Sequence, residues 1–198
     1  MLAWARLLRC SGPQRDARHQ RVLGTVTTRV QALPLFCCGA TVSLRMANTP
    51  TLDFELESAS GGTRKLRELR GRVVVVFWED RERQTQNLPL KRELGQLGAD
   101  LALRRAVSVM GIGDVSAFDF APARTFVRTT IRIIAPMAGI ELLLDWRGLL
   151  ARPPFSLTVG RSNVLVIDAH GREALRRDGA LDEAQRTEVI DAVRALVG

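Results

Sequence analysis

Three carboxylates that could hold a metal ion lie shortly after an apolar run at residues 73–77: Glu79, Asp80 and Glu82. The run is mostly β-branched, which predicts a strand covered on both faces of a sheet. Open α/β sheets bind ligands at the carboxyl ends of such strands. Because divalent cations prefer oxygen ligands, this spacing permits a metal-dependent enzyme.

The same positions also allow ordinary surface ion pairs. Arg81 and Arg83 are interleaved with the acidic residues and can neutralise them without a metal. We therefore predict no metal and no cofactor. A metal-dependent enzyme, with Asp114 or Asp119 as further oxygen ligands, is the alternative.

Thiol and imidazole groups are scarce in most of the chain. The three cysteines, Cys10, Cys37 and Cys38, fall within the first 45 residues, and the adjacent pair lacks the CxxC spacing. Residues 46–198 contain no cysteine and a single histidine, His170, which lies in a predicted turn without a nucleophile forced near it. We therefore predict no catalytic residue.

The formal net charge of +8 is unevenly distributed. Residues 1–45 carry seven arginines against one acidic residue, which leaves 22 basic and 20 acidic residues in the remainder. A domain with so little excess positive charge lacks the basic surface that nucleic-acid binding requires. No stretch reaches the roughly 18 apolar residues of a membrane span, so we expect neither a nucleic-acid partner nor a span.

Residues 1–45 show no sustained apolar period, and we expect a disordered or wrongly assigned extension outside the fold. A transit peptide, a poor secretory signal and translation from a wrongly chosen start are the alternatives, and we favour the last. Met46 then begins the domain, which spans 46–198. The protein is expected in the cytoplasm if translation starts at Met46, and in the periplasm if residues 1–45 act as a signal.

Apolar periodicity predicts the elements that position these residues. The predicted strands are 52–57 (an edge strand), 73–77, 102–112, 141–145, 164–167 and 173–177, and the predicted helices are 87–98, one opening at Pro122 and one starting at Asp182. Asn87 is expected to cap the first helix, and Asp182 to form a capping box with Gln185.

Two further side-chain groups allow a functional or a structural interpretation. Arg124, Arg128 and Arg132 recur at helical spacing, and we favour a solvated helix face over an anion-binding stripe. Trp78 and Trp146 each follow a predicted strand, and we favour core packing over the wall of a groove.

The order of the elements, together with the closing string 160–171, resembles the thioredoxin and peroxiredoxin superfamily. Residues 142–150 resemble the peroxiredoxin segment in which a strand ends in an Asp and a turn before a short helix. Residues 125–128 and 178–181 are similar to the YtfJ-type group of bacterial thioredoxin-fold proteins. The resemblance implies an α/β class and a thioredoxin fold, with a mixed central sheet and helices on both faces.

Two departures from the superfamily imply that the domain is redox-inactive. The segment from Trp78 to Thr85 has no cysteine where active members carry one, and Ser162 stands where they carry a cis-proline. A cis bond costs a proline about 0.5–1 kcal/mol but another residue about 3–4 kcal/mol. We therefore predict a trans Arg161–Ser162 bond and a relaxed loop at 160–163.

The leading functional hypothesis is a non-catalytic binding or scaffold protein that holds a protein or peptide in the groove of this fold. The candidate groove residues are Trp78, Glu79, Asp80, Arg81, Arg161, Ser162 and Asn163. A regulatory role, which is a label given to YtfJ-type proteins, is a further alternative. The small net charge of residues 46–198 and the lack of a helix-turn-helix signature argue against it. The oligomeric state is left open.

Overall fold

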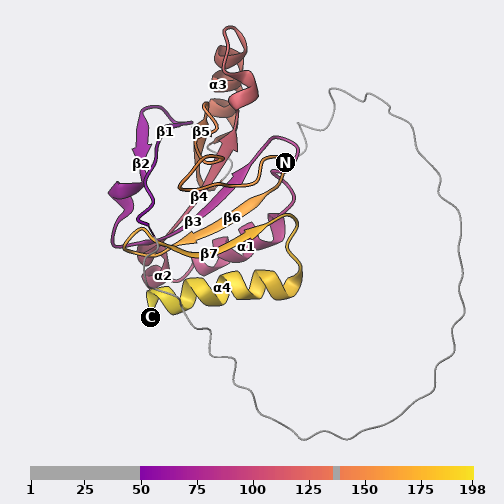
Figure 1. Ribbon diagram of the computed structural model, residues 1–198. Helices are drawn as coiled ribbons and strands as arrows, with labels where there is room; N and C mark the ends of the chain where they lie inside the picture. Colours follow the sequence, from indigo (N-terminus) through magenta and orange to yellow (C-terminus); the bar gives the residue numbers. More distant parts are fainter. Residues whose placement is uncertain (1–49, 136–138) are drawn as a thin grey trace, which may run out of the picture. The chain divides into compact units, whose positions relative to one another are not determined.

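The computed structural model describes residues 50–135 and 139–198, which include a seven-stranded sheet (Figure 1). The predicted extension, residues 1–45, lies outside this range. The strands are β1 (Glu55–Ser58), β2 (Thr63–Lys65), β3 (Val73–Glu79), β4 (Val107–Asp114), β5 (Glu141–Asp145), β6 (Asn163–Ile167) and β7 (Glu173–Asp178). The helices are α1 (Leu88–Leu97), α2 (Leu101–Ala106), α3 (Ala123–Ile134) and α4 (Glu183–Val197), with 3-10 helices η1 (Leu66–Leu69) and η2 (Ser116–Phe118).

The sheet has the order β2-β1-β5-β4-β3-β6-β7 and is mixed. Strands β3, β4 and β5 run parallel, whereas β6 is antiparallel to β3 and forms a hairpin with β7. Strand β1 is antiparallel to both β5 and β2. The mixed sheet and the α/β class predicted from the sequence are therefore confirmed.

All seven residues of β3 are buried, and their alternation separates two apolar layers. Val73, Val75 and Phe77 pack with α1 and α4, which lie along one face of the sheet in Figure 1. Val74, Val76 and Trp78 pack on the other face, beneath η1, the segment 52–56 and the loop residues 150–157. Covering both faces excludes water from β3 and fixes its carboxyl end.

Helix α3 contacts a smaller apolar cluster. Val127 and Ile131 pack against Val115, Leu144 and Trp146 near the carboxyl ends of β4 and β5. Figure 1 shows α3 away from α1 and α4. This helix therefore makes few apolar contacts, and none of its residues is fully buried.

The local signals of the last helix are confirmed. The Asp182 carboxylate accepts a hydrogen bond from the Gln185 backbone N–H at 2.8 Å, and the Gln185 side chain accepts one from the Asp182 N–H at 3.1 Å. Residues Val189, Ile190 and Val193 are buried on the sheet side of α4. Both halves of the capping box satisfy backbone donors that a helix start leaves free.

Three predictions of elements were wrong. Strand β1 is not at the edge, because the three-residue strand β2, too short for a periodic signal, pairs with it. Residues 101–106 form α2 rather than strand, since the Asp100 carboxylate caps Ala102 at 2.8 Å. After β5, residues 146–157 form turns and bends rather than a short helix, and the buried Asp145 accepts the backbone N–H of Leu149 and Leu150.

Candidate functional site at the carboxyl end of strand β3

Sheet pairing brings two of the predicted segments together. Strand β6 is antiparallel to β3, and its first residue, Asn163, pairs with Trp78. The residues before β6 therefore lie beside those at the end of β3, which joins positions 78–81 to positions 161–163. The predicted groove residues do come from one end of the sheet.

A buried polar network joins these segments to α1. The Ser162 hydroxyl donates to Glu79 Oε1 at 2.6 Å and accepts from Asn87 Nδ2 at 2.8 Å. Lys91 Nζ lies 2.5 Å from Glu79 Oε2 and also donates to the Gln84 carbonyl oxygen. Glu79, Asn87 and Ser162 are 7%, 1% and 0% exposed. Such groups are stable in the interior because each is hydrogen-bonded.

Asn87 has a different role from the helix cap predicted for it. Its side chain makes no capping bond to α1. Its Nδ2 donates instead to the Gly179 carbonyl oxygen at 2.9 Å, and its Oδ1 accepts from the Leu181 N–H at 3.0 Å. An amide can both donate and accept, so one buried side chain ties the start of α1 to the loop before β6 and to the turn after β7.

The exposed rim of this network is rich in arginine. Arg83 Nε donates to the Gly160 carbonyl oxygen at 3.0 Å, while the Asp80 carboxylate accepts the Arg83 backbone N–H at 2.9 Å. Arg161 pairs with Asp178 at 3.1 Å, and its side chain is 59% exposed. Arg81 is also exposed. A partner at this place meets guanidinium groups, whereas Glu79 and Ser162 lie beneath the surface.

Trp78 and Asn163 stabilise the site from the other side of the sheet. Trp78 is 1% exposed in the apolar core, as predicted, and its Nε1 has no hydrogen-bond partner among the described residues. Asn163 accepts from the Thr158 N–H and donates to the carbonyl oxygens of Thr158 and Arg161. These bonds hold the 158–161 loop in one conformation.

The Arg161–Ser162 bond is trans, as predicted. The cis bonds found in residues 50–135 and 139–198 are those at Ala121–Pro122 and Pro153–Pro154. The loop at 160–163 carries no strained backbone, since its one positive φ, 75°, is at Gly160. Ser162 and Asn163 are buried, and their side chains are hydrogen-bonded. These hydrogen bonds offset the cost of removing the polar atoms from water. The loop closes over the end of β3.

The acidic residues proposed as metal ligands have separate partners. Asp114 accepts from the Ser116 hydroxyl at 2.7 Å, and Asp119 pairs with Arg124 at 2.8 Å. Within the described ranges, no three His, Cys, Asp or Glu residues gather as metal ligands would. The metal alternative gains no support from this arrangement.

The exposed His170 lies in the turn after β6, where its backbone N–H donates to Asp168.

The arginine stripe on α3 is partly solvated, with Arg128 and Arg132 exposed as expected, but two of its three arginines, Arg124 and Arg128, also make ion pairs within the domain. Arg128 makes two 2.6 Å hydrogen bonds to the Glu57 carboxylate, and Trp146 Nε1 donates to the same carboxylate at 3.0 Å. The guanidinium carbons of Arg124 and Arg128 lie 4.8 and 5.6 Å from the Trp146 ring centroid. The hydrogen bond from Arg128 is the main cause that lowers the pKa of Glu57. The ion pair between Arg128 and Glu57 therefore links α3 to β1.

Sequence reasoning missed Asn87 and Lys91 as members of the network. Both lie on the face of α1 that also carries the buried Leu94, at a spacing of four and then three residues. A polar pair continuing an apolar helical face toward the end of a buried strand is the signal that could have identified them.

Solved structures share this arrangement of strands and helices. The pneumococcal exposed lipoprotein thioredoxin Etrx1 of Streptococcus pneumoniae is 16% identical, with 73% of this chain and 100% of that chain covered and a TM-score of 0.55. A secreted thiol-disulfide isomerase of Corynebacterium glutamicum is 17% identical, with 74% and 84% covered and a TM-score of 0.55. A DsbF homologue of Corynebacterium diphtheriae is 15% identical, with 74% and 86% covered and the same TM-score.

The domain has a thioredoxin-like fold. This confirms the fold predicted from the sequence, and identities of this size support the fold alone. No protein-family model matches the chain, and no curated protein matches its sequence. In the part of the chain described, no helix combines the length and the apolar character needed to cross a membrane.

Proposed function

We propose that residues 46–198 form a redox-inactive binding module of the thioredoxin fold that holds a protein or peptide at the carboxyl end of β3. The observation that carries the proposal is the buried network of Glu79, Ser162 and Asn87. It stands where the superfamily resemblance implies a reactive thiol, and residues 46–198 contain no cysteine. The YtfJ-type resemblance is compatible with such a module.

The partner contacts the rim rather than the network itself. The loop itself carries Arg161 and Val159, which is 65% exposed. Arg83 bonds the Gly160 carbonyl oxygen of the same loop, while Arg81 is the exposed residue two positions before Arg83. Guanidinium groups bind carboxylates through paired hydrogen bonds, and an exposed aliphatic side chain favours an apolar neighbour. An extended segment that combines an acidic with an apolar residue fits this rim.

The redox part of the proposal is tested on the full chain. A matched variant replaces Cys10, Cys37 and Cys38 with alanine, and both proteins are assayed for reduction of insulin disulfides and for peroxide consumption. We expect neither to exceed a blank without protein. Turnover that persists in the variant without cysteine would overturn the proposal that residues 46–198 are redox-inactive. Turnover that the variant loses would instead place thiol chemistry in the first 45 residues, outside the proposed module.

The binding part is tested by photo-crosslinking in extracts of the source cell. A benzophenone amino acid is placed at Val159 and, as a control, at Ala184, an exposed position of α4. We expect one reproducible adduct from position 159 only, and a weaker adduct when Arg161→Glu is added but not when Arg92→Glu is added. Equal adducts from both positions, or insensitivity to Arg161→Glu, would remove the rim as the binding site.

A further inference from the structure

An apolar groove lies beside α1 on the sheet face that this helix covers. It has a volume of about 340 Å³, and β4 contributes Val107 and Val109 to it. Strand β4 lies inside the sheet, between β3 and β5, yet both valines are only half-buried. Interior parallel strands are normally covered on both faces. The groove therefore exposes sheet surface that α1 and α3 leave uncovered.

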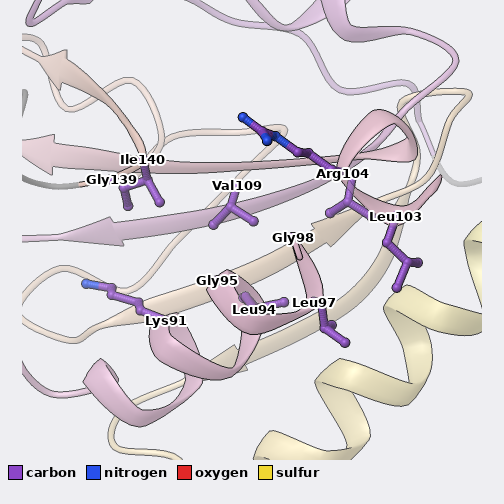
Figure 2. A pocket seen from close by; sticks show the side chains of 11 residues that line it. Lys91, Leu94, Gly95, Leu97, Gly98, Leu103, Arg104, Val109, Gly139 and Ile140 are labelled. Carbon is purple, nitrogen blue, oxygen red and sulfur yellow. The ribbon is translucent and has the colours of Figure 1, made fainter. Parts of the chain in front are cut away.

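Gly95 keeps the α1 side of this groove open. It lies in the interior of α1, where glycine is among the least favourable residues. A Cβ atom at Gly95 would meet no heavy atom within 4 Å, so close packing does not require a glycine here. In Figure 2, Gly95 and Leu94 lie on the helix facing Val109 on the strand. The glycine leaves room that a larger side chain would fill.

The charged residues that line the groove have one sign. They are Lys91 and Arg104, and no acidic side chain of residues 50–135 or 139–198 lines it. The Lys91 ammonium group forms an ion pair with the Glu79 carboxylate. Arg104 has no ion pair within the described part of the chain, and Figure 2 shows its side chain extending from α2 on the side of the groove opposite Lys91. A ligand would thus present apolar groups to the floor and an anion to Arg104.

We propose that this groove binds a straight-chain fatty acid, with its chain along Leu94, Leu97 and Val109 and its carboxylate at Arg104. The volume is near the lower limit for small-molecule sites, which are mostly apolar with a few polar groups that fix orientation. A folded partner would need a larger contact area. The site is separate from the rim proposed above, so either proposal can fail alone.

The test measures binding of decanoate to the full chain by calorimetry, below the concentration at which it forms micelles. Decyltrimethylammonium, which has the same chain and the opposite charge, serves as the control ligand. We expect decanoate to bind about tenfold more tightly or better. Equal affinity for the two ligands, or no decanoate binding up to about 1 mM, would overturn the proposal.

Two variants locate the site. Gly95→Leu fills the groove and also favours the helix, so we expect about tenfold weaker binding without loss of stability, whereas Ala184→Leu on α4 leaves binding unchanged. Arg104→Gln should remove the preference for decanoate over decyltrimethylammonium, whereas Arg92→Gln on α1 should keep it. Unchanged decanoate affinity in Gly95→Leu, with the fold intact by circular dichroism, would rule out this groove.

Discussion

Two polar clusters hold helices of this domain to the sheet, and they differ chiefly in their exposure. Glu79 joins Lys91 of α1 and Ser162 in the interior. Glu57 joins Arg128 of α3, where the two side chains are 27% and 47% exposed. Both carboxylates bind a cation at about the same distance, 2.5 and 2.6 Å.

The difference in exposure changes what each cluster can do. In the buried cluster, a group that loses its partner stays unsatisfied, because water cannot replace the partner. In the exposed cluster, water solvates either member of the pair, so its loss costs little. We therefore expect the β3 network to fix one structure, and the α3 cluster to allow local opening of that helix.

The largest effect is expected from Lys91→Met. This change leaves the Glu79 carboxylate, 7% exposed, without its cation, and breaking a buried pair costs about 3–5 kcal/mol. Urea unfolding of the full chain measures the loss. The control is Lys65→Met, because Lys65 pairs with Glu55 at 3.3 Å on the surface, where the expected cost is below about 1 kcal/mol.

A double variant separates the charge from the packing of the long side chain. Adding Glu79→Gln to Lys91→Met removes the unpaired charge, and neutral replacements of buried pairs are often tolerated. We expect the double variant to be more stable than Lys91→Met alone. If it is less stable, the network does not act as a charge pair, and the contrast between the two clusters fails.

The next largest effect is expected from Asn87→Ala. The change removes one side chain that serves Ser162, Gly179 and Leu181, and it leaves buried groups unsatisfied at about 1–3 kcal/mol each. We expect a loss of about 3 kcal/mol in urea unfolding. Gln86→Ala, at the exposed neighbouring position, is the matched control and should be nearly neutral. A small effect of Asn87→Ala would show that water reaches the network.

The elements that could be predicted have strong local signals. Strand β3 begins with six apolar residues in a row, and α4 begins with a capping box at Asp182, so the sequence alone predicts both elements. The three-residue strand β2 and the capped helix α2 are too short for a periodic pattern.

The candidate site was only partly predictable. Superfamily resemblance placed Ser162 near the end of β3, but nothing local joins it to Asn87, which is 75 positions away in the chain. The arginine stripe was detected, while its partner Glu57 lies 71 positions from Arg128. Long-range polar pairs depend on tertiary packing, and a single sequence carries no periodic signal for them.

A smaller effect is expected from Arg128→Ala in the α3 cluster. It removes two hydrogen bonds from Glu57, but the pair is partly exposed, so we expect a loss of about 1 kcal/mol or less. Salt screens exposed charges, and the loss should therefore shrink in 1 M sodium chloride, where the screening length is about 3 Å. Fluorescence of Trp146 and hydrogen exchange in α3 report the change. A loss as large as that of Lys91→Met would contradict the comparison.

The smallest effect is the pH dependence of the same cluster. The hydrogen bond from Arg128 lowers the pKa of Glu57 below its ordinary value of 4.5. A carboxyl whose pKa is lower in the folded protein contributes stability above its unfolded pKa, and that contribution is lost as the pH falls through the lower folded value. The free energies of unfolding of the wild type and Glu57→Gln should therefore differ at neutral pH by less than about 1 kcal/mol, and should converge as the pH falls below 4.5 and through the lower folded pKa. Urea unfolding at a series of pH values measures this difference.

Glu188→Gln serves as the control, because Glu188 of α4 pairs with Arg177 of β7 and makes no ion pair with α3 within the described residues. Its effect on unfolding should leave the hydrogen exchange of α3 unchanged at each pH. If the difference in unfolding free energy between the wild type and Glu57→Gln persists or grows in acid, Glu57 stabilises α3 through the packing of its side chain rather than through its charge.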